Sequence, residues 1–531
     1  MENLLLQENE SLSFSIDANI IFENKKLLSP CIESFKLIIL SSKDFTEIQS
    51  NLIKNCQEGN IENLLLRPIT WKILLNILEC NKTTTIKTWI EKTKKDRIDY
   101  LKKKYDKNDK KQCKNFDGDP LSINNNNNNN WDLYFNDNKL KEIIQKDVNR
   151  TFQNNILFRI DYIKKILLDI LFIWSKDNIN LSYRQGMSDI LGMLLLCFFP
   201  YYFSVNNNTD NLNNINDEMI FEPLKYSKSF YLFFHNEKYF ECDLFIIFDS
   251  IMKEGLINFY KFNNNILDYK KFELFDQIYT DYNYVNLKDD FFYLKCNKII
   301  KEYLKIYDFQ LYDFLNKKEI DCVIFLEKWL KCLLCREFSN NETFIFWDAI
   351  FAENYIKGNK NFDFLDFICV SMIENIKNNV MDEKNESCYS LFFNYPKINS
   401  AVDLLKLAYK IRSNIDTKIF EEKNKFLRES DNKNNDNSLN INSAEMINQS
   451  NYQKNNNKYL DFFGVEEKER EILETDFQKN FSDETQFSQE QKIINKLNEI
   501  NNKYKSNFNT NDKLDFNFII ETLKKKFRKK K

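Results

Sequence analysis

The chain has 531 residues, of which 43% are hydrophobic and 15% aromatic, so it can bury a large core. Its formal net charge of -3 excludes a chain-wide basic surface for nucleic acid, and its 12 cysteines follow no disulfide framework. Because there are only 7 glycines and 6 prolines, we expect helices joined by polar loops, which is an all-α fold class.

The first part of the chain combines extensions with a helical pattern. We interpret residues 1–54, which mix short apolar runs with polar spacers, as an N-terminal extension. Residues 1–10 are too acidic and polar for a secretory signal, so we expect a cytoplasmic protein. At 59–78, apolar residues recur at helical spacing and predict one core helix. The charged and then Asn-rich segment 102–130 predicts a surface insertion.

Long segments of helical period extend from residue 131 to residue 412, and they predict one continuous helical array. Asn-rich or polar loops near 206–216 and 262–290 interrupt it. The most apolar run, 190–205, is shorter than the ~20 residues of a membrane-spanning helix and contains Pro200. We therefore interpret this run as a buried helix.

The C-terminal part is polar. Residues 413–457 are dense in Asn, Lys, Asp and Ser, which is the composition of a linker. We expect 458–531 to form a helical tail, because apolar residues in 514–531 fall on one helical face. The last eight residues are nearly all cationic, which fits contact with an anionic membrane surface, a solvated tail or a nuclear-import-like patch equally well.

Several kinds of chemistry are excluded or disfavoured. His235 is the only histidine, so catalytic triads and His-rich metal sites have a single candidate residue. Cys332 and Cys335 form a CxxC without a second pair at zinc-finger spacing, and we interpret them as core cysteines within a helical pattern. No phosphate-binding glycine loop occurs, so we expect no nucleotide, metal or other cofactor of the chain's own.

Arg150 stands out because only ten of the 76 basic residues are arginines, whose planar guanidinium differs from the point charge of lysine. In the segment IQKDVNR at 144–150, Asp147 lies three residues before Arg150 and therefore shares its helix face. Asp147 can thus orient Arg150. The alternative for this spacing alone is an exposed helical ion pair without a function.

A second segment, YRQGMSD at 183–189, directly precedes the apolar run. In a chain with so few glycines, Gly186 beside Gln185 suggests a place where the backbone approaches another group closely. Ser188 or Asp189 is expected to cap the following helix, whose amino end favours anions. The alternative is a simple loop-to-helix turn.

Together these segments resemble the TBC-domain family of Rab GTPase-activating proteins, whose hallmarks are an IxxDxxR motif and a YxQGM motif a few tens of residues apart. Both motifs occur here in that order, and the resemblance covers roughly residues 59–412. Flanking segments agree with the family pattern: Leu66-Arg67 with Trp71, the E-x-D-x-F segment at 241–245, the W…REF…WD pattern between 329 and 348, and Tyr395-Pro396.

A finer similarity points to the member-five subfamily of TBC-domain proteins, which works with the endosomal retromer coat. Residues 119–122, 131–135 and 147–152 carry it. The sequence departs from that subfamily at Gln153 and Ser339, where the subfamily usually has proline. Neither departure removes a group to which the resemblance gives a catalytic role.

The resemblance implies a large two-lobed helical domain, at 55–412, that activates a Rab-family GTPase. Arg150 would act as an arginine finger, and Gln185 as a glutamine finger replacing the GTPase's own glutamine. Asp147 would hold Arg150, with Thr151 in the same supporting set. Tyr183 and Gly186 would shape the loop that presents Gln185.

The resemblance also implies partners. These are a Rab-family GTPase, which would bring Mg-GTP with it, and retromer or another coat on endosomal or other endomembranes that carry vesicle traffic. The alternative is a TBC-like scaffold that binds a Rab or a coat without accelerating hydrolysis. A helical repeat protein is disfavoured, since no fixed-period self-similarity occurs. Which Rab is recognised cannot be deduced from these motifs.

Overall fold

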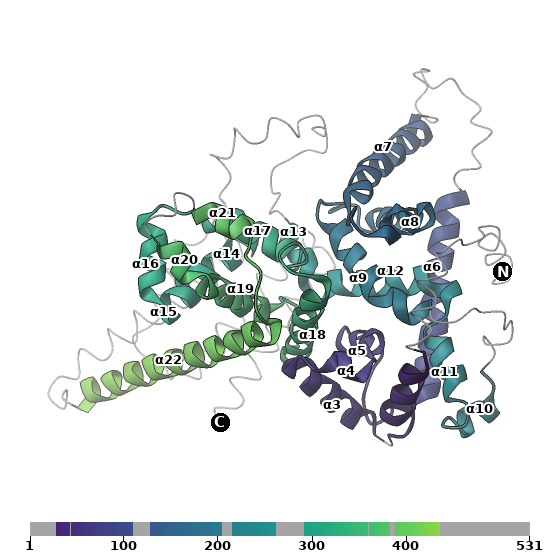
Figure 1. The fold of residues 1–531 in the computed structure, drawn as a ribbon, viewed down its shortest axis with the longest axis horizontal. Coiled ribbons are helices and arrows are strands. Elements are labelled where there is room, and N and C mark those ends of the chain that lie inside the picture. The colour runs from purple at the N-terminus through teal and green to yellow at the C-terminus, as the bar shows by residue number, and fades with distance from the viewer. Residues whose placement is uncertain are drawn as a thin grey trace, which may run out of the picture. The chain divides into compact units, whose positions relative to one another are not determined.

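The computed structural model of the protein describes residues 28–42, 44–109, 128–203, 215–261, 291–358, 360–382 and 388–435, with only the backbone described at 107–109, 128–133 and 422–435. The chain divides into two compact units, Met1–Glu422 and Lys423–Lys531, and the description below concerns the first. Every regular element in the described ranges is a helix, which confirms the all-α fold class (Figure 1). The basic segment 514–531 lies outside the described residues.

The N-terminal helices differ from the single core helix that the sequence predicts at 59–78. After η1 (Lys36–Leu40) and α3 (Phe45–Glu58), two short helices follow, α4 (Ile61–Leu64) and α5 (Arg67–Leu74). Leu65 between them has a left-handed backbone with φ of 52°. Pro68 lies in the first turn of α5, where its missing N–H costs no hydrogen bond. Proline therefore starts a new helix there instead of continuing the previous one.

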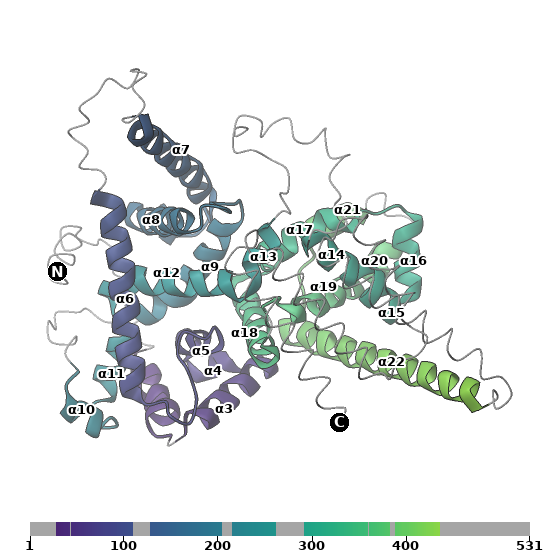
Figure 2. The ribbon, with the colours of Figure 1, turned by 180° about the vertical axis from the view of Figure 1, so that it is seen from behind.

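Helix α12 (Phe240–Ile251) packs against α6 (Ile86–Asp109), α8 (Asp161–Asp177) and α9 (Met187–Tyr202), and α7 (Asn128–Arg150) lies along α8. Both ribbon views show α7 and α8 side by side and α12 crossing α6 (Figures 1 and 2). Most of α9 is buried, and Pro200 lies inside it. The buried helix predicted for 190–205 is confirmed, although it begins earlier and ends at Tyr202.

Helix α18 (Asn340–Lys357) joins segments that are far apart in the sequence. It packs against α3, α5, α9 and α19 (Asp363–Asn375). Its Asp348 is fully buried and accepts a hydrogen bond from Arg67 Nε at 3.1 Å and one from Trp71 Nε1 at 2.7 Å. Two helices of the resemblance that are far apart in the sequence, α5 and α18, therefore meet at one buried carboxylate.

The remaining elements complete the helical array and are mostly short. They are η3 (Ile156–Arg159), α10 (Asp217–Phe221), α11 (Ser227–Phe234), η4 (Glu237–Tyr239), η5 (Met252–Leu256), α13 (Ile257–Tyr260), α14 (Phe291–Asn297), η7 (Lys298–Leu304), α15 (Lys305–Tyr307), α16 (Phe309–Lys317), α17 (Cys322–Lys331), α20 (Lys377–Met381), α21 (Cys388–Phe393) and α22 (Ala401–Asn435).

Helix α22 continues past residue 412 into the segment whose composition predicts a linker. Its apolar side chains Leu405, Ala408, Ile411 and Ile415 are buried. Once these turns are fixed by packing, adding further helical residues is much easier than starting a helix. A polar composition alone therefore does not end the helix. The domain boundaries proposed from the sequence remain predictions.

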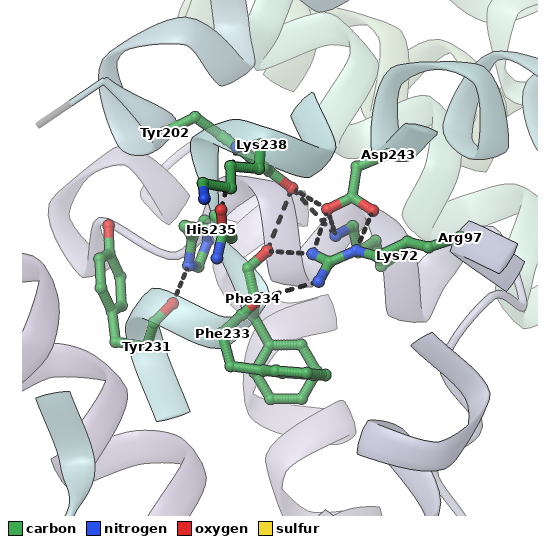
Figure 3. A network of polar contacts seen from close by, with 10 residues as sticks. Lys72, Arg97, Tyr202, Tyr231, Phe233, Phe234, His235, Lys238 and Asp243 are labelled. Atoms are coloured by element: carbon green, nitrogen blue, oxygen red, sulfur yellow. Dashed lines mark hydrogen bonds and ion pairs between the residues drawn. The ribbon is translucent and has the colours of Figure 1, made fainter. Parts of the chain in front are cut away.

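A buried polar network ties four helices together (Figure 3). Asp243 of α12 accepts hydrogen bonds from Arg97 Nε at 2.9 Å, Lys72 Nζ at 3.1 Å and Tyr202 Oη at 2.5 Å. Burial would raise the pKa of the Asp243 carboxyl, but Arg97 and Lys72 hold it below the usual value. Tyr202 ends α9, so this network fixes the far end of the helix that begins at the YxQGM motif.

Candidate functional site

The last turn of α7 presents Arg150 to solvent and holds it through Asp147. The Arg150 side chain is 66% exposed, whereas that of Asp147 is 11% exposed. Arg150 Nη2 donates to one carboxylate oxygen of Asp147, and Tyr183 Oη donates to the other at 2.7 Å. The structure thus brings the two sequence motifs together at one carboxylate, which contacts both the arginine and the tyrosine.

Thr151 directly follows α7 and fixes the last turn of that helix. Its hydroxyl donates to the Asp147 carbonyl oxygen at 2.9 Å, and its backbone N–H donates to the same oxygen. A Cβ added to Gly192 of α9 would lie 2.9 Å from the Phe152 ring and 2.9 Å from Thr151 Cγ2. Gly192 therefore lets the end of α7, with Arg150, lie directly against α9. Sequence analysis did not identify Gly192.

Gln185 lies in the loop before α9 and is exposed. Its side chain makes no hydrogen bond to any residue that the structure describes, and none joins it to Arg150. Gly186 follows with φ of 100°, and an added Cβ would lie 3.2 Å from Cys332 Sγ and 3.3 Å from Tyr260 Oη. The close backbone approach predicted for Gly186 is confirmed.

The predicted helix caps are wrong. Gly186 itself occupies the N-cap position of α9, and no side chain caps the helix there. Ser188 and Asp189 lie inside the first turn and are buried. Gly186 adopts a left-handed backbone, and the helix starts two residues earlier than a cap at Ser188 requires and three residues earlier than a cap at Asp189 requires.

Asp189 instead pairs with Arg336, 147 residues further along the chain. Arg336 Nε donates to Asp189 Oδ2 at 3.0 Å, and Nη2 donates to the same oxygen. Burial raises the pKa of the Asp189 carboxyl, and Arg336 opposes that effect. Arg336, the first residue of the REF segment at 336–338, thus holds the first turn of α9 through this ion pair. This contact could not be deduced from two segments so far apart.

An open groove of about 550 Å³ lies beside Arg150. Apart from Arg150 its lining carries no charge, and it consists of Phe152, Gln153, Asn154, Asn155, Leu196 and Asn340. The two positions where the subfamily usually has proline lie at this groove or next to it. Gln153 lines it and donates to the Asn149 carbonyl oxygen at 2.8 Å, while Ser339 forms a reciprocal cap with Glu342 at the start of α18.

Arg184 is a further candidate functional residue, although the two motifs do not assign it a role. Its Nε is buried and has no hydrogen-bond partner among the described residues. Burial lowers the pKa of its guanidinium. The signal that could have identified it is its rarity, since it is one of ten arginines and directly precedes Gln185.

Other sites that the sequence singled out are structural. His235 is buried, and burial with the charge of Lys72 lowers the pKa of its imidazole to about 3. Cys332 and Cys335 are buried and not disulfide-bonded, which confirms them as core cysteines. Within the described ranges no cluster of three or more His, Cys, Asp or Glu side chains could hold a metal ion. No helix in those ranges is long and apolar enough to cross a membrane.

Comparisons with known proteins show which proteins this chain is similar to. TBC1 domain family member 5 of Mus musculus is 27% identical over 364 residues, which is 67% of this chain and 41% of that protein. Its homolog B in Dictyostelium discoideum is 24% identical over 480 residues, covering 73% of this chain and 44% of that protein. The chain thus spans less than half the length of these relatives. The crystal structure of the Ypt/Rab-GAP domain of Gyp1p covers 75% of this chain and 99% of its own, at 17% identity and a TM-score of 0.47.

The model of the Rab-GTPase-TBC domain family matches residues 65–381, which is more than half of the chain. The matched range contains both motifs and the carboxylate that joins them. Relatives that carry the member-five name confirm the expected similarity to that subfamily. The chain therefore belongs to the Rab-GTPase-TBC domain family.

Proposed function

We propose that the protein activates GTP hydrolysis by a Rab-family small GTPase and donates Arg150 and Gln185 to the reaction. The observation that carries this proposal is the shared carboxylate of Asp147, which contacts Tyr183 at 2.7 Å and also pairs with Arg150. It couples the residue that would neutralise charge to the loop that would position water.

The chemistry of phosphoryl transfer explains why two side chains are needed. The rate depends on positioning the attacking water and on neutralising the charge that develops between the β- and γ-phosphates. A guanidinium supplies two parallel donors for phosphate oxygens, and an amide supplies one donor and one acceptor for water. Arg150 would serve the first purpose and Gln185 the second, while Mg²⁺ would arrive with the partner's GTP.

The exposure of both side chains supports this assignment. Among the described residues Arg150 forms an ion pair with Asp147 alone, and because the Arg150 side chain is 66% exposed, solvent screens that pair. The guanidinium can therefore leave Asp147 at little cost when a phosphate becomes available. Gln185 has no hydrogen bond to break among the described residues. The supporting residues Asp147, Thr151 and Gly186 are buried, so the scaffold stays fixed while the fingers move.

The test is single-turnover GTP hydrolysis by a panel of purified Rab proteins, with the full chain added as wild type, Arg150→Lys or Gln185→Ala. An arginine finger supplied in trans contributes ~10³ to 10⁵ in rate, so we expect Arg150→Lys to lose most of the stimulation. Matched controls are Arg159→Lys and Gln145→Ala, which should keep it. Stimulation by Arg150→Lys close to wild type would contradict the assignment.

A second candidate function is a scaffold that captures a Rab or a coat such as retromer without turnover. The chain spans less than half the length of its relatives, so other functions of those proteins could reside in parts that they do not share with it. A scaffold would bind GTP-loaded Rab equally well with both fingers replaced, and the wild type would not accelerate hydrolysis. Membrane contact through 514–531 is a separate proposal, checked by deleting that segment and measuring binding to anionic liposomes.

A further inference from the structure

A second carboxylate lies close to the proposed arginine finger. Asp189 is in the first turn of α9, four residues after Gln185, and its side chain is 13% exposed. Tyr183, six residues before Asp189, donates to the Asp147 carboxylate at 2.7 Å, which brings the start of α9 to the carboxylate that holds Arg150, and the charges of Asp147 and Arg150 act on the Asp189 carboxyl. In the ranges that the structure describes, Arg150 nevertheless forms its ion pair with Asp147 alone.

Arg336 accounts for this selectivity. It forms two hydrogen bonds to the same Asp189 oxygen and has no other carboxylate partner in the part of the chain that the structure describes. Its position is fixed by the turn that follows α17, where Leu333 and Leu334 have left-handed backbones. Trp347 Nε1 of α18 donates to the Leu333 carbonyl oxygen at 2.7 Å and anchors that turn. This anchored turn therefore places the guanidinium of Arg336 against Asp189.

We propose that Arg336 is a positioning residue that neutralises Asp189 and thereby leaves Arg150 free to reach the partner's nucleotide. This inference rests on the proposed function. A partly buried carboxylate without a partner attracts a nearby cation. Without Arg336, the exposed guanidinium of Arg150 is the cation that Asp189 would attract. Arg150 would then be held by two carboxylates, and its transfer to a phosphate would cost more.

The simpler alternative is that the Arg336–Asp189 pair only tethers α9 to the turn after α17. The two explanations differ in what happens when Asp189 loses its charge. If the pair is a tether, the double variant Asp189→Asn with Arg336→Met, which lacks the hydrogen bonds, is as impaired as Arg336→Met alone, although Asp189→Asn by itself can keep them through its amide oxygen. If Arg336 neutralises Asp189, Asp189→Asn is harmless and also corrects the loss of Arg336.

The experiment uses the full chain as wild type, Arg336→Met, Asp189→Asn and the double variant, with the Rab protein on which the wild type is most active. Single-turnover hydrolysis at increasing concentrations of the chain separates the maximal rate from half-saturation. We expect Arg336→Met to lower the maximal rate about tenfold, equivalent to ~1.4 kcal/mol, with half-saturation unchanged. Asp189→Asn and the double variant should stay within about twofold of the wild-type maximal rate, because neither has a carboxylate at position 189 that could attract Arg150. A tenfold loss in Arg336→Met can be distinguished from that range.

Each other outcome has a definite meaning. An impaired Asp189→Asn, or a double variant no faster than Arg336→Met, would overturn the inference while leaving the proposed function intact. If Arg336→Met does not fold, as judged by thermal melting, the rate of Asp189→Ala, which removes both the charge and the hydrogen-bond acceptor, decides between the explanations. A wild-type chain that stimulates no Rab protein would overturn the proposed function, and the inference would fail with it.

Discussion

At the scale of single residues, the site depends on one carboxylate, that of Asp147, which Tyr183 and Arg150 share as a hydrogen-bond partner. Both oxygens of Asp147 accept a hydrogen bond, one from Tyr183 and one from Arg150. Tyr183 is mostly buried and fixes the carboxylate, whereas Arg150 is exposed and contributes little to stability. The same carboxylate can therefore stay in place when the arginine leaves it.

Gly192 allows the end of α7 to contact α9, and its replacement provides a test of that contact. Alanine favours a helix interior over glycine by ~1 kcal/mol, but a Cβ at this position would lie 2.9 Å from Phe152 and Thr151. We expect Gly192→Ala to displace the end of α7 and lower GTPase stimulation severalfold, without a rise in melting temperature. A more stable variant with wild-type stimulation would show that the contact is not needed.

Sequence reasoning identified the part of the site that is local in the chain. The i,i+3 spacing placed Asp147 beside Arg150, and the rarity of glycine marked Gly186. It could not find the contacts of Gly192 with Phe152 or of Arg336 with Asp189, because these depend on how separate helices pack. The predicted caps failed because a left-handed glycine, and not a polar side chain, begins α9.

At the scale of helices, apolar periodicity predicted that helices occur but not where they end. The pattern at 59–78 continues across Leu65, whose left-handed backbone breaks it into α4 and α5. The composition after residue 412 is polar, and α22 continues through it to Asn435. Ends of helices depend on one backbone conformation or on packing of preceding turns, and neither leaves a periodic signal.

The network around Asp243 joins four helices and predicts a large loss of stability when its charge is removed. Asp243→Asn would leave Arg97 and Lys72 buried without a carboxylate, and breaking a buried pair in this way costs ~3–5 kcal/mol. The control is Asp99→Asn, whose exposed pair with Lys102 should change the free energy of unfolding by less than about 0.5 kcal/mol. Equal melting temperatures for the two variants would contradict this account.

At the scale of the whole molecule, His235 makes stability depend on pH. The unfolded chain takes up a proton on His235 below its usual pKa of 6.5, whereas the folded chain resists it down to about 3. Between these values the unfolded state binds more protons, so the contribution of His235 to stability falls as the pH falls. Asp348 and Asp366 act in the opposite direction, because burial raises the pKa of each carboxyl to about 6.

Comparison with His235→Phe isolates the histidine, since the two carboxyls contribute equally to both proteins. We expect the wild type's stability advantage over this variant to shrink by about 1 kcal/mol between pH 6 and pH 5, as chemical denaturation would show. A phenylalanine keeps the ring that stacks on Tyr231 and removes the titration. An advantage that stays constant over this interval would mean that His235 is not kept neutral by the fold.

The buried contact between Arg67 and Asp348 has a consequence for the synthesis of the protein. The two residues are 281 positions apart. At elongation rates of ~5–20 residues per second, Arg67 is made roughly 15 to 55 s before Asp348. During that time Arg67 stays hydrated and Trp71 lacks the helix that will cover it. The N-terminal helices can therefore complete their packing only after α18, which carries Asp348, has been made.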